Sequence, residues 1–460
     1  MFRYLYIGLG ITVFIFTHTN FIFAESSFSK RNHELKSLED LLNQNDGSIP
    51  NVIVDNLTLD EYVRLGLKRN QQLKAVFYQW KASLKKVPQA FSLPDPQFSF
   101  TEYIESVETR VGPQNRAFSV KQKLPLPDKL WIRKSKSFKA SESVYHRFEQ
   151  IRLDIVYKIT DVYYEYAYLY KAILLTKENM TLLINFESVA QSRYASGLTE
   201  NQDLLKVQVE LGKLESDLYT LQDRRSALMA RLNALLNLPE TTILPWPKVS
   251  FQNVYSKETK EEMEALILKL KKDNPQLLSM DNKVEQNKEN VKLAKRAYVP
   301  DLTVGFTQVN TGDALNSSLA DSGKDAQMVM FSVNVPIWFN RINAEIQEAE
   351  AFLQATESSR VNKEKELLSQ LAFVHYQYSD ALRQSWLYKD GLIPKAVQTL
   401  NATKTGYESG KVDFLSLIDA QRMLLNFQLS YYRHAANVQQ KLAQINTLIG
   451  SIDQTLEGEK

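Results

Sequence analysis

Residues 128–196 have the sequence DKLWIRKSKSFKASESVYHRFEQIRLDIVYKITDVYYEYAYLYKAILLTKENMTLLINFESVAQSRYAS, a long run without glycine or proline. Because these two residues end or bend most helices, the run predicts one continuous helix. At about 1.5 Å per residue it is about 100 Å long, several times the width of a compact domain. Gly197 follows where a helix end favours glycine, and a second helical segment over 200–238 is closed by Pro239. The sequence therefore predicts a long helical hairpin in an elongated protein.

The segment before this run has the two-residue period of β-strands. Apolar and polar residues alternate in QFSFTEYI (97–104) and again in AFSVKQKL (117–124). The residues between them include RVGP (110–113), which is typical of a turn. We therefore predict a β-hairpin over 97–124 with one apolar and one polar face.

The same plan occurs a second time in the chain. Each copy is predicted to consist of a helix, two strands and a long helical hairpin. In the first copy the leading helix covers 58–90. In the second copy the predicted elements are a helix over 260–297, strands over 302–309 and 328–335, a helix over 337–390 that resumes after Gly391 and Pro394 as far as Thr405, a turn at Gly406 and Gly410, and a last helix over 413–449.

This duplication can be tested by counting. Residues 194–237 align without gaps on 407–450, at one constant offset in the numbering, with 10 identities in 44 positions. Ordinary residue frequencies give about two or three identities by chance. The period is far longer than the roughly 20–50 residues of solenoid repeats. The chain therefore contains two copies of one unit.

The N-terminus has the features of a targeting segment. Arg3 supplies a positive charge, the apolar run 4–16 is too short to span a bilayer comfortably, and Ala24 precedes the expected cleavage point. The alternative is an uncleaved membrane anchor. No later apolar stretch is long enough to span a bilayer as a helix. We divide the chain into a signal peptide (1–24), a flexible N-terminal lead-in (25–56), a first repeat (57–239), an irregular connection (240–257), a second repeat (258–450) and a C-terminal tail (451–460).

Composition excludes several classes of function. The 460-residue chain has no cysteine, so disulfides, thiolate metal sites, cysteine catalysis and an N-terminal lipid anchor are excluded. Its net charge of +3 gives no electrostatic reason to expect nucleic acid as a partner. The five histidines are scattered, and the sequence has no phosphate-binding loop and no zinc or serine hydrolase motif. We predict no metal, no cofactor and no enzymatic activity, so any energy must come from a partner.

The last helix and the strands indicate how the fold is completed. Eleven positions from Phe414 to Ile449 are spaced alternately three and four residues apart, and nine of them are apolar residues, alanine or tyrosine. This coiled-coil seam needs lateral helix partners, although an ordinary bundle helix is the alternative. Four strands cannot close a barrel, and their apolar face needs either a protein core or lipid.

Three chains with four strands each would close a 12-stranded barrel with alternating lipid-facing and lumen-facing residues. We therefore predict a mainly α protein with a small β part: an outer-membrane barrel that carries a tube of long coiled-coil helices. The predicted lipid-facing residues are Phe98, Phe100, Phe118, Val120, Val304, Phe306, Phe331 and Val333.

Several short motifs, in this order and spacing, resemble the outer-membrane efflux protein (TolC) family over about residues 57–450. None is specific alone. The motifs are LPDP (93–96), ETRVGPQ (108–114), LPLP (124–127), YESG (407–410) and LIDAQR (417–422). The resemblance implies a homotrimeric channel-tunnel in the outer membrane of a Gram-negative-type cell, with its helical part in the periplasm. It also implies docking on an inner-membrane pump (RND type) through a periplasmic adaptor. The ETRVGPQ motif favours the branch that is paired with heavy-metal pumps (CzcC-like), whose cargo is metal cations; small toxic compounds are the other cargo class.

In this family the turns between paired long helices form the periplasmic tip, where the adaptor docks and the tunnel narrows. The resemblance places the docking tip at Tyr194, Gly197, Leu198, Tyr407, Gly410 and Lys411. It places constriction or gating candidates at Asp419, Asp413, Asp203, Glu200 and Ser416, of which Ser416 stands where some members have a second aspartate. Three carboxylates around a narrow axis would select cations. The alternative for the acids, above all Glu200 and Asp413, is a solvated helix start. The alternative for the whole chain is a periplasmic coiled-coil scaffold or adaptor without a pore.

Overall fold

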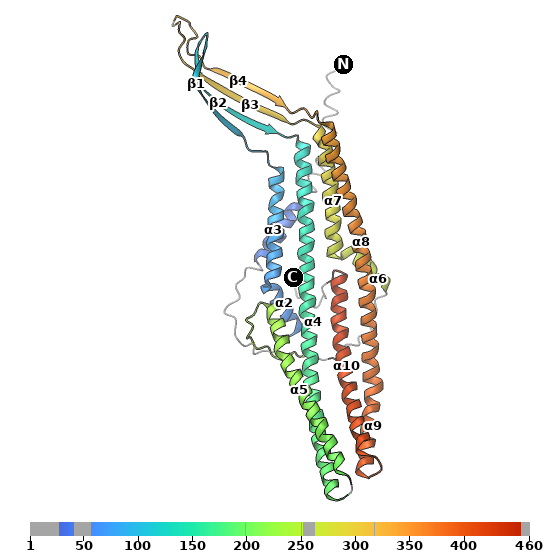
Figure 1. The fold of residues 1–460 in the computed structure, drawn as a ribbon. Coiled ribbons are helices and arrows are strands. Elements are labelled where there is room, and N and C mark those ends of the chain that lie inside the picture. The colour runs from blue at the N-terminus through green and yellow to red at the C-terminus, as the bar shows by residue number, and fades with distance from the viewer. Residues whose placement is uncertain are drawn as a thin grey trace. The chain divides into compact units, whose positions relative to one another are not determined.

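The computed structural model describes residues 27–40, 57–197, 199–249, 251, 263–316 and 318–451. The chain divides into two compact units, each assembled from segments that are distant in sequence (Figure 1). We call them the sheet unit and the turn unit. The sheet unit comprises, where described, Met1–Lys36, Tyr78–Tyr145 and Ser279–Val361, and the turn unit comprises Ser37–Phe77, His146–Leu278 and Asn362–Lys460.

Helices dominate the described part of the chain. A short helix over 27–40 comes first. The others are α2 (Leu59–Arg69), α3 (Gln71–Phe91), α4 (Pro127–Ala195), α5 (Asn201–Leu236), α6 (Met263–Asp273), α7 (Pro275–Lys295), a 3-10 turn η3 (Arg296–Tyr298), α8 (Phe339–Trp386), a π-helical turn η4 (Leu387–Leu392), α9 (Ile393–Glu408) and α10 (Phe414–Leu448).

The predicted uninterrupted helix is confirmed as α4, which has 69 residues. It begins at Pro127. Proline is tolerated there because the backbone N–H of a first helical residue has no partner within the helix. The paired helix α5 and the last helix α10 also match the predicted ranges within two residues. The glycine and proline pattern was therefore sufficient to locate the long helices.

The leading helix of each repeat was predicted to be continuous, and this is wrong. The range 58–90 is divided into α2 and α3 at Asn70, and the range 260–297 is divided into α6 and α7 at Asn274. In each case the asparagine side chain accepts a hydrogen bond from the backbone three residues later, at Leu73 or Leu277. The buried side-chain oxygen thus starts the second helix as an N-cap.

The prediction of a flexible lead-in over 25–56 is wrong for residues 27–40, which are helical. Within the sheet unit the Arg31 guanidinium donates to both Glu142 carboxylate oxygens at 2.9 Å and lies 3.7 Å from the Tyr145 ring centroid. The Tyr145 hydroxyl in turn donates to Glu34 at 2.7 Å. These contacts with distant residues order a polar segment whose own sequence has only a weak apolar pattern. Residues 41–56, like the predicted signal peptide, lie outside the described residues.

The predicted interruption near Gly391 and Pro394 takes a mild form. The helix passes from α8 through the π-helical turn η4 into α9, with Pro394 in the first turn of α9, where its missing N–H is tolerated. The long helix of the second repeat therefore continues from α8 into α9 through one π-helical turn.

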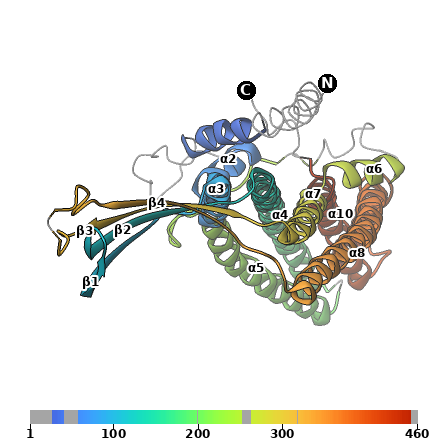
Figure 2. The same cartoon turned by 90° about the horizontal axis from the view of Figure 1, so that it is seen from above.

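The two pairs of strands form one four-stranded antiparallel sheet in the order β1-β2-β3-β4 (Figure 2). The strands are β1 (Gln97–Thr109), β2 (Gly112–Leu124), β3 (Leu302–Thr311) and β4 (Ala326–Val333). The hairpin over 97–124 is confirmed, and the strands of the second repeat are shifted by at most two residues from their predicted ends. Pairing of β2 with β3, which belong to different repeats, joins the two repeats in one sheet.

The register places all eight predicted apolar residues on one face. Phe98 pairs with Val120 and Phe100 with Phe118, and Val120 pairs in turn with Phe306. Val304 pairs with Phe331, and Leu302 with Val333. Most of these side chains are exposed in the single chain. The opposite face carries Gln97, Ser99, Thr101, Lys121, Lys123, Thr303 and Ser332.

Within the described residues, hydrophobic clusters hold the helices of the turn unit together, and two of them join several helices each. One lies around the ends of α4, α5, α9 and α10 and includes Phe186, Val207, Phe414 and Leu417. The other joins α6, α8 and α10 through residues such as Leu270, Leu371 and Ile445. In the part of the chain that the structure describes, no helix is both long and apolar enough to cross a membrane.

Candidate functional site

The two predicted tip turns have matching backbone geometry. Gly197 has φ 69° and Gly410 has φ 75°, in the left-handed region that glycine adopts without strain. The Gly197 amide donates to the Tyr194 carbonyl at 2.9 Å, and the Gly410 amide donates to the Tyr407 carbonyl at 3.0 Å. Because Tyr194 and Gly197 are the repeat equivalents of Tyr407 and Gly410, both copies of the repeat end their long helix with one turn type. Leu198 lies outside the described residues.

Arg193 joins the first turn to the second. Its Nη1 donates to the Glu408 carbonyl at 2.9 Å, and its guanidinium lies 4.9 Å from the Tyr407 ring centroid. Tyr407 is only 3% exposed and packs on Phe414. Its ring therefore shapes the turn, whereas the exposed surface is supplied by residues such as Tyr194 and Lys411.

Glu200 and Asp413 occupy equivalent positions, one residue before α5 and α10 respectively. Asp413 is the N-cap of α10 and accepts from the Ser416 backbone amide at 3.0 Å. Interactions with the Ser416 side chain and amide lower the pKa of Asp413. Glu200 makes no side-chain cap bond and instead accepts from the Gln202 amide group at 2.6 Å. Asp413 thus has a clear structural role, whereas the exposed Glu200 carboxylate has none among the described contacts.

Asp203 is tied into the first turn. The Thr199 hydroxyl donates to its carboxylate, and Lys206 lies 3.8 Å away. The side chain is mostly buried, and its charge adds to burial in raising the pKa of Tyr407. Asp203 therefore holds the start of α5 near the buried tyrosine of the other turn.

Asp419, like Glu200, is an exposed candidate acid, with its side chain 58% exposed. Among the described contacts its partner is Arg422, one turn later on α10, with 3.4 Å between Arg422 Nη1 and Asp419 Oδ1. Ser416, also exposed, lies one turn before it and donates its backbone amide to Asp413. Asp413, Ser416 and Asp419 thus succeed one another at three-residue spacing along one side of the first turns of α10.

An ion pair between α10 and α5 that involves a buried glutamate was not predicted from the sequence. Arg422 Nη2 donates to Glu210 Oε2 at 2.5 Å, across from α10 to α5, and the Glu210 side chain is only 4% exposed. This hydrogen bond lowers the pKa of Glu210. The sequence does contain a signal for this pair, because Val207, Glu210 and Leu214 have the spacing of a helix seam. The structure buries all three residues, and a buried glutamate requires a cationic partner.

A second missed contact involves Gln421, the residue directly before Arg422. The Gln421 side chain donates to the Asn179 side-chain oxygen at 2.8 Å, joining α10 to α4. Both residues are buried. Polar pairs of this kind fix the register of packed helices, so α10 has a defined height against α4 and α5.

Alanine at position 413 should loosen the start of α10. Asp413→Ala removes the acceptor of the Ser416 amide, so we expect that amide to exchange with solvent several-fold faster. Asp413→Asn keeps a side-chain oxygen at this position and should retain most of the protection. Hydrogen exchange on the purified protein measures both variants, and equal protection of Ser416 in the wild type and in Asp413→Ala would contradict the cap.

Comparison with known proteins shows which family and which relatives the chain is similar to. Residues 266–451 match the sequence model of the family described as "Outer membrane efflux protein". The chain is 21% identical over 403 residues to the cobalt-zinc-cadmium resistance protein CzcC of Cupriavidus metallidurans, covering 86% of this chain and 90% of that protein. It is 23% identical over 258 residues to toxin and drug export protein A of Aggregatibacter actinomycetemcomitans, and there the match spans about half (54%) of each chain.

Solved structures share the fold over most of the chain. The outer-membrane channel OprN matches with a TM-score of 0.73 and 14% identity, covering 86% of this chain and 90% of that one. VceC of Vibrio cholerae has a TM-score of 0.70 and 17% identity, covering 85% and 96%. CusC has a TM-score of 0.71 and 13% identity, covering 90% and 96%. The family model thus matches the second repeat, and the fold over most of the chain is similar to that of these solved outer-membrane channels.

Proposed function

We propose that the chain is the outer-membrane channel of a tripartite efflux system, a passive duct that a homotrimer forms. The single observation that carries this proposal is the four-stranded sheet, one face of which carries all eight predicted apolar residues. Within the described residues the outer edges of β1 and β4 have no partner strand. Three copies joined edge to edge would satisfy those edges and close a 12-stranded barrel whose apolar face meets lipid.

The helices also offer surface for a second copy. On α5 the apolar or small residues Leu205, Val209, Gly212 and Tyr219 are exposed in the single chain, at the spacing of one helix face. A stripe of this kind is typical of a helix that packs against a lateral neighbour. A soluble scaffold would also bury such a stripe, but it would not need the sheet with an apolar face.

For the tip we propose that the turns at Gly197 and Gly410 receive a periplasmic adaptor, with Tyr194 and Lys411 as exposed contacts. We propose Asp419 as the constriction residue, supported by its exposure and its position one turn after Ser416. Asp413 and Asp203 support this surface by capping α10 and holding α5, and Glu200 is a secondary candidate. Three copies of Asp419 around one axis would favour cations.

For the cargo we propose a chemical class and no single compound. An inner-membrane pump and its adaptor are the partners that would select the exported compound. The names of the two relatives refer to cobalt, zinc and cadmium resistance in one case and to toxin and drug export in the other. The match to the first of these covers the larger share of this chain. We therefore propose heavy-metal cations as the preferred cargo class and small toxic compounds as the second candidate. In this proposal the chain forms a passive path for the cargo and catalyses no reaction.

Conductance in a planar bilayer tests the channel and the constriction together. Purified wild-type protein should give discrete steps of one size, since each trimer adds one pore. Asp419→Ala should lower the preference for cations over anions several-fold, because three carboxylates leave the narrowest part of the pore. The measurement is the reversal potential in a KCl gradient.

Asp217→Ala is the matched control, because it removes an exposed carboxylate from α5 farther from the turn. It should leave the ion preference unchanged. Steps with an unaltered preference in Asp419→Ala would keep the duct and remove Asp419 from the constriction. A protein that does not insert at all would favour the periplasmic scaffold.

A further inference from the structure

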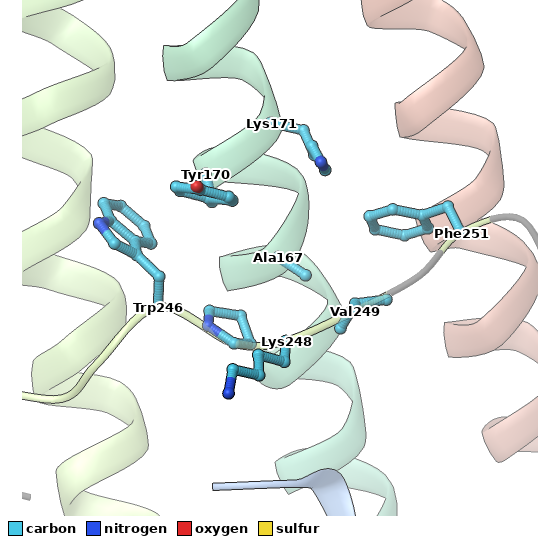
Figure 3. A pocket seen from close by; sticks show the side chains of 8 residues that line it. Ala167, Tyr170, Lys171, Trp246, Lys248, Val249 and Phe251 are labelled. Atoms are coloured by element: carbon cyan, nitrogen blue, oxygen red, sulfur yellow. The ribbon is translucent and has the colours of Figure 1, made fainter. Parts of the chain in front are cut away.

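A pocket of about 320 Å³ lies in the turn unit between α4 and the connection that follows α5 (Figure 3). Trp246 and Tyr170 stand on one side of it and Phe251 on the other, with Ala167 between them on the helix. Lys171 and Lys248 lie at opposite ends of the opening. The lining residues are Ala167, Tyr170, Lys171, Trp246, Pro247, Lys248, Val249 and Phe251.

The aromatic wall at Trp246 is held from behind. Trp246 stacks on Tyr166 with 4.7 Å between ring centroids, and the Arg225 guanidinium lies 4.2 Å from the Trp246 ring. Arg225 Nε donates to the Tyr166 hydroxyl at 3.2 Å, and that hydroxyl donates to the Leu244 carbonyl at 3.1 Å. The opposite wall is fixed by Phe251, which packs on Tyr432 of α10 at 5.6 Å. The walls are therefore in place before any ligand arrives.

The pocket carries positive charge without a counter-charge. Among the eight lining residues there are two lysines and no carboxylate. Neither Lys171 nor Lys248 forms an ion pair within the part of the chain that the structure describes. The Lys171 ammonium lies 5.7 Å from the ring centroids of Tyr170 and Tyr432, so the cation stands beside apolar surface. Such a site gains most from an anion that also has an apolar body.

We propose that this pocket binds a small organic anion in which a flat aromatic body carries one carboxylate. The aromatic body fits between Trp246 and Phe251, and the carboxylate accepts from Lys171. The volume is at the lower end of ligand pockets, so a fused two-ring compound suits it better than a drug-sized molecule. The proposal concerns a face of the turn unit and does not depend on pore formation.

Binding of 2-naphthoate to the full chain tests the proposal. Equilibrium dialysis of the detergent-purified protein, corrected for empty micelles, should show one saturable site per chain. Lys171→Met keeps the length of the side chain and removes its charge, so we expect about tenfold weaker binding, as the loss of one charge-assisted hydrogen bond predicts. Trp246→Leu should weaken binding at least as much, because it removes one aromatic wall.

Two controls separate this site from general partitioning. Lys177→Met, at an exposed lysine of α4 outside the pocket, should bind 2-naphthoate like the wild type. The neutral isostere 2-naphthalenemethanol should bind the wild type no better than 2-naphthoate binds Lys171→Met. Circular dichroism checks that each variant is folded. Equal affinity of the wild type and Lys171→Met for 2-naphthoate would overturn the proposal, as would the absence of a saturable site in the wild type.

Discussion

Asn274→Ala should destabilise the junction of α6 and α7 by about 4 kcal/mol, because two buried hydrogen bonds and one partly buried hydrogen bond lose their partner. The Asn274 side-chain oxygen accepts from the Gln276 and Leu277 amides at 2.9 Å and 3.1 Å. Its side-chain nitrogen donates to the Leu448 carbonyl at 2.8 Å. The residue is 1% exposed, so water cannot replace these partners in the folded state.

The effect reaches beyond the junction because Leu448 is the last residue of α10. One side chain therefore starts α7 and satisfies the end of the last helix of the repeat. Hydrogen exchange should rise in peptides that cover 263–282 and also in those that cover the C-terminal end of α10, near 440–451. Thermal unfolding in detergent, followed by circular dichroism, should show a clearly lower midpoint.

Asn70→Ala provides an internal comparison in the other repeat. Asn70 accepts from the Leu73 amide and donates to the Leu235 carbonyl, each at 3.1 Å. It makes one side-chain bond fewer than Asn274, so its replacement should cost less than that of Asn274. Asn401→Ala, at an exposed asparagine of α9, should change stability little. A fall in stability for Asn274→Ala no greater than for Asn401→Ala would contradict the structural role.

These asparagines also show what sequence reasoning could not supply. Asparagine inside a helical pattern is only mildly unfavourable, so the pattern over 58–90 and 260–297 predicted continuous helices. The break depends on the carbonyl of Leu235 or Leu448, each of which is distant in the chain from its asparagine. Only the folded structure brings that acceptor to the asparagine.

Features encoded over short distances were predicted well. The absence of glycine and proline determined α4, and the period of two residues placed all eight apolar strand residues on one face. The glycines of the two turns were recognised because only glycine adopts φ near 70° freely. The helix over 27–40 was missed because long-range contacts of Arg31 hold it.

The candidate acids at the turns illustrate the same limit. Their sequence positions are nearly equivalent, yet the structure gives them different roles. Asp413 caps a helix, Asp203 is held by Thr199, and Asp419 remains open next to Arg422. Charge and spacing identify where carboxylates lie, but the neighbouring side chains decide which of them can face a pore.

Arg422→Met should destabilise the packing of α10 against α5 by about 3 kcal/mol, because it leaves the buried Glu210 carboxylate without its cation. The Arg422 side chain is 41% exposed, so water can partly solvate the Glu210 carboxylate that remains. The expected loss of stability is therefore at the lower end of the range for breaking a buried ion pair. The double variant Glu210→Leu with Arg422→Met replaces both charges by apolar groups. It should recover to within about 1 kcal/mol of the wild type.

The pH dependence distinguishes a buried ion pair from simple loss of packing. The hydrogen bond from Arg422 lowers the pKa of Glu210 below its ordinary 4.5. The stability that the pair contributes is therefore present above about pH 4.5 and is lost as the pH falls through the lowered pKa. In Arg422→Met the uncompensated carboxylate is costly at pH 7 and becomes neutral in acid. The difference in stability between wild type and Arg422→Met should accordingly shrink between pH 7 and pH 4.

Hydrogen exchange locates the effect, since α5 and α10 are the helices that follow the two glycine turns. Exchange should rise over 201–215 and 414–428 in Arg422→Met and return toward wild type in the double variant. Lys411→Met, which removes an exposed cation near the second turn, is the control and should change neither segment. A stability difference that stays constant from pH 7 to pH 4 would show that Arg422 acts by packing alone. A pH-dependent difference would show that the charge pair of Glu210 and Arg422 stabilises the packing of α5 against α10, the helix that carries Asp419.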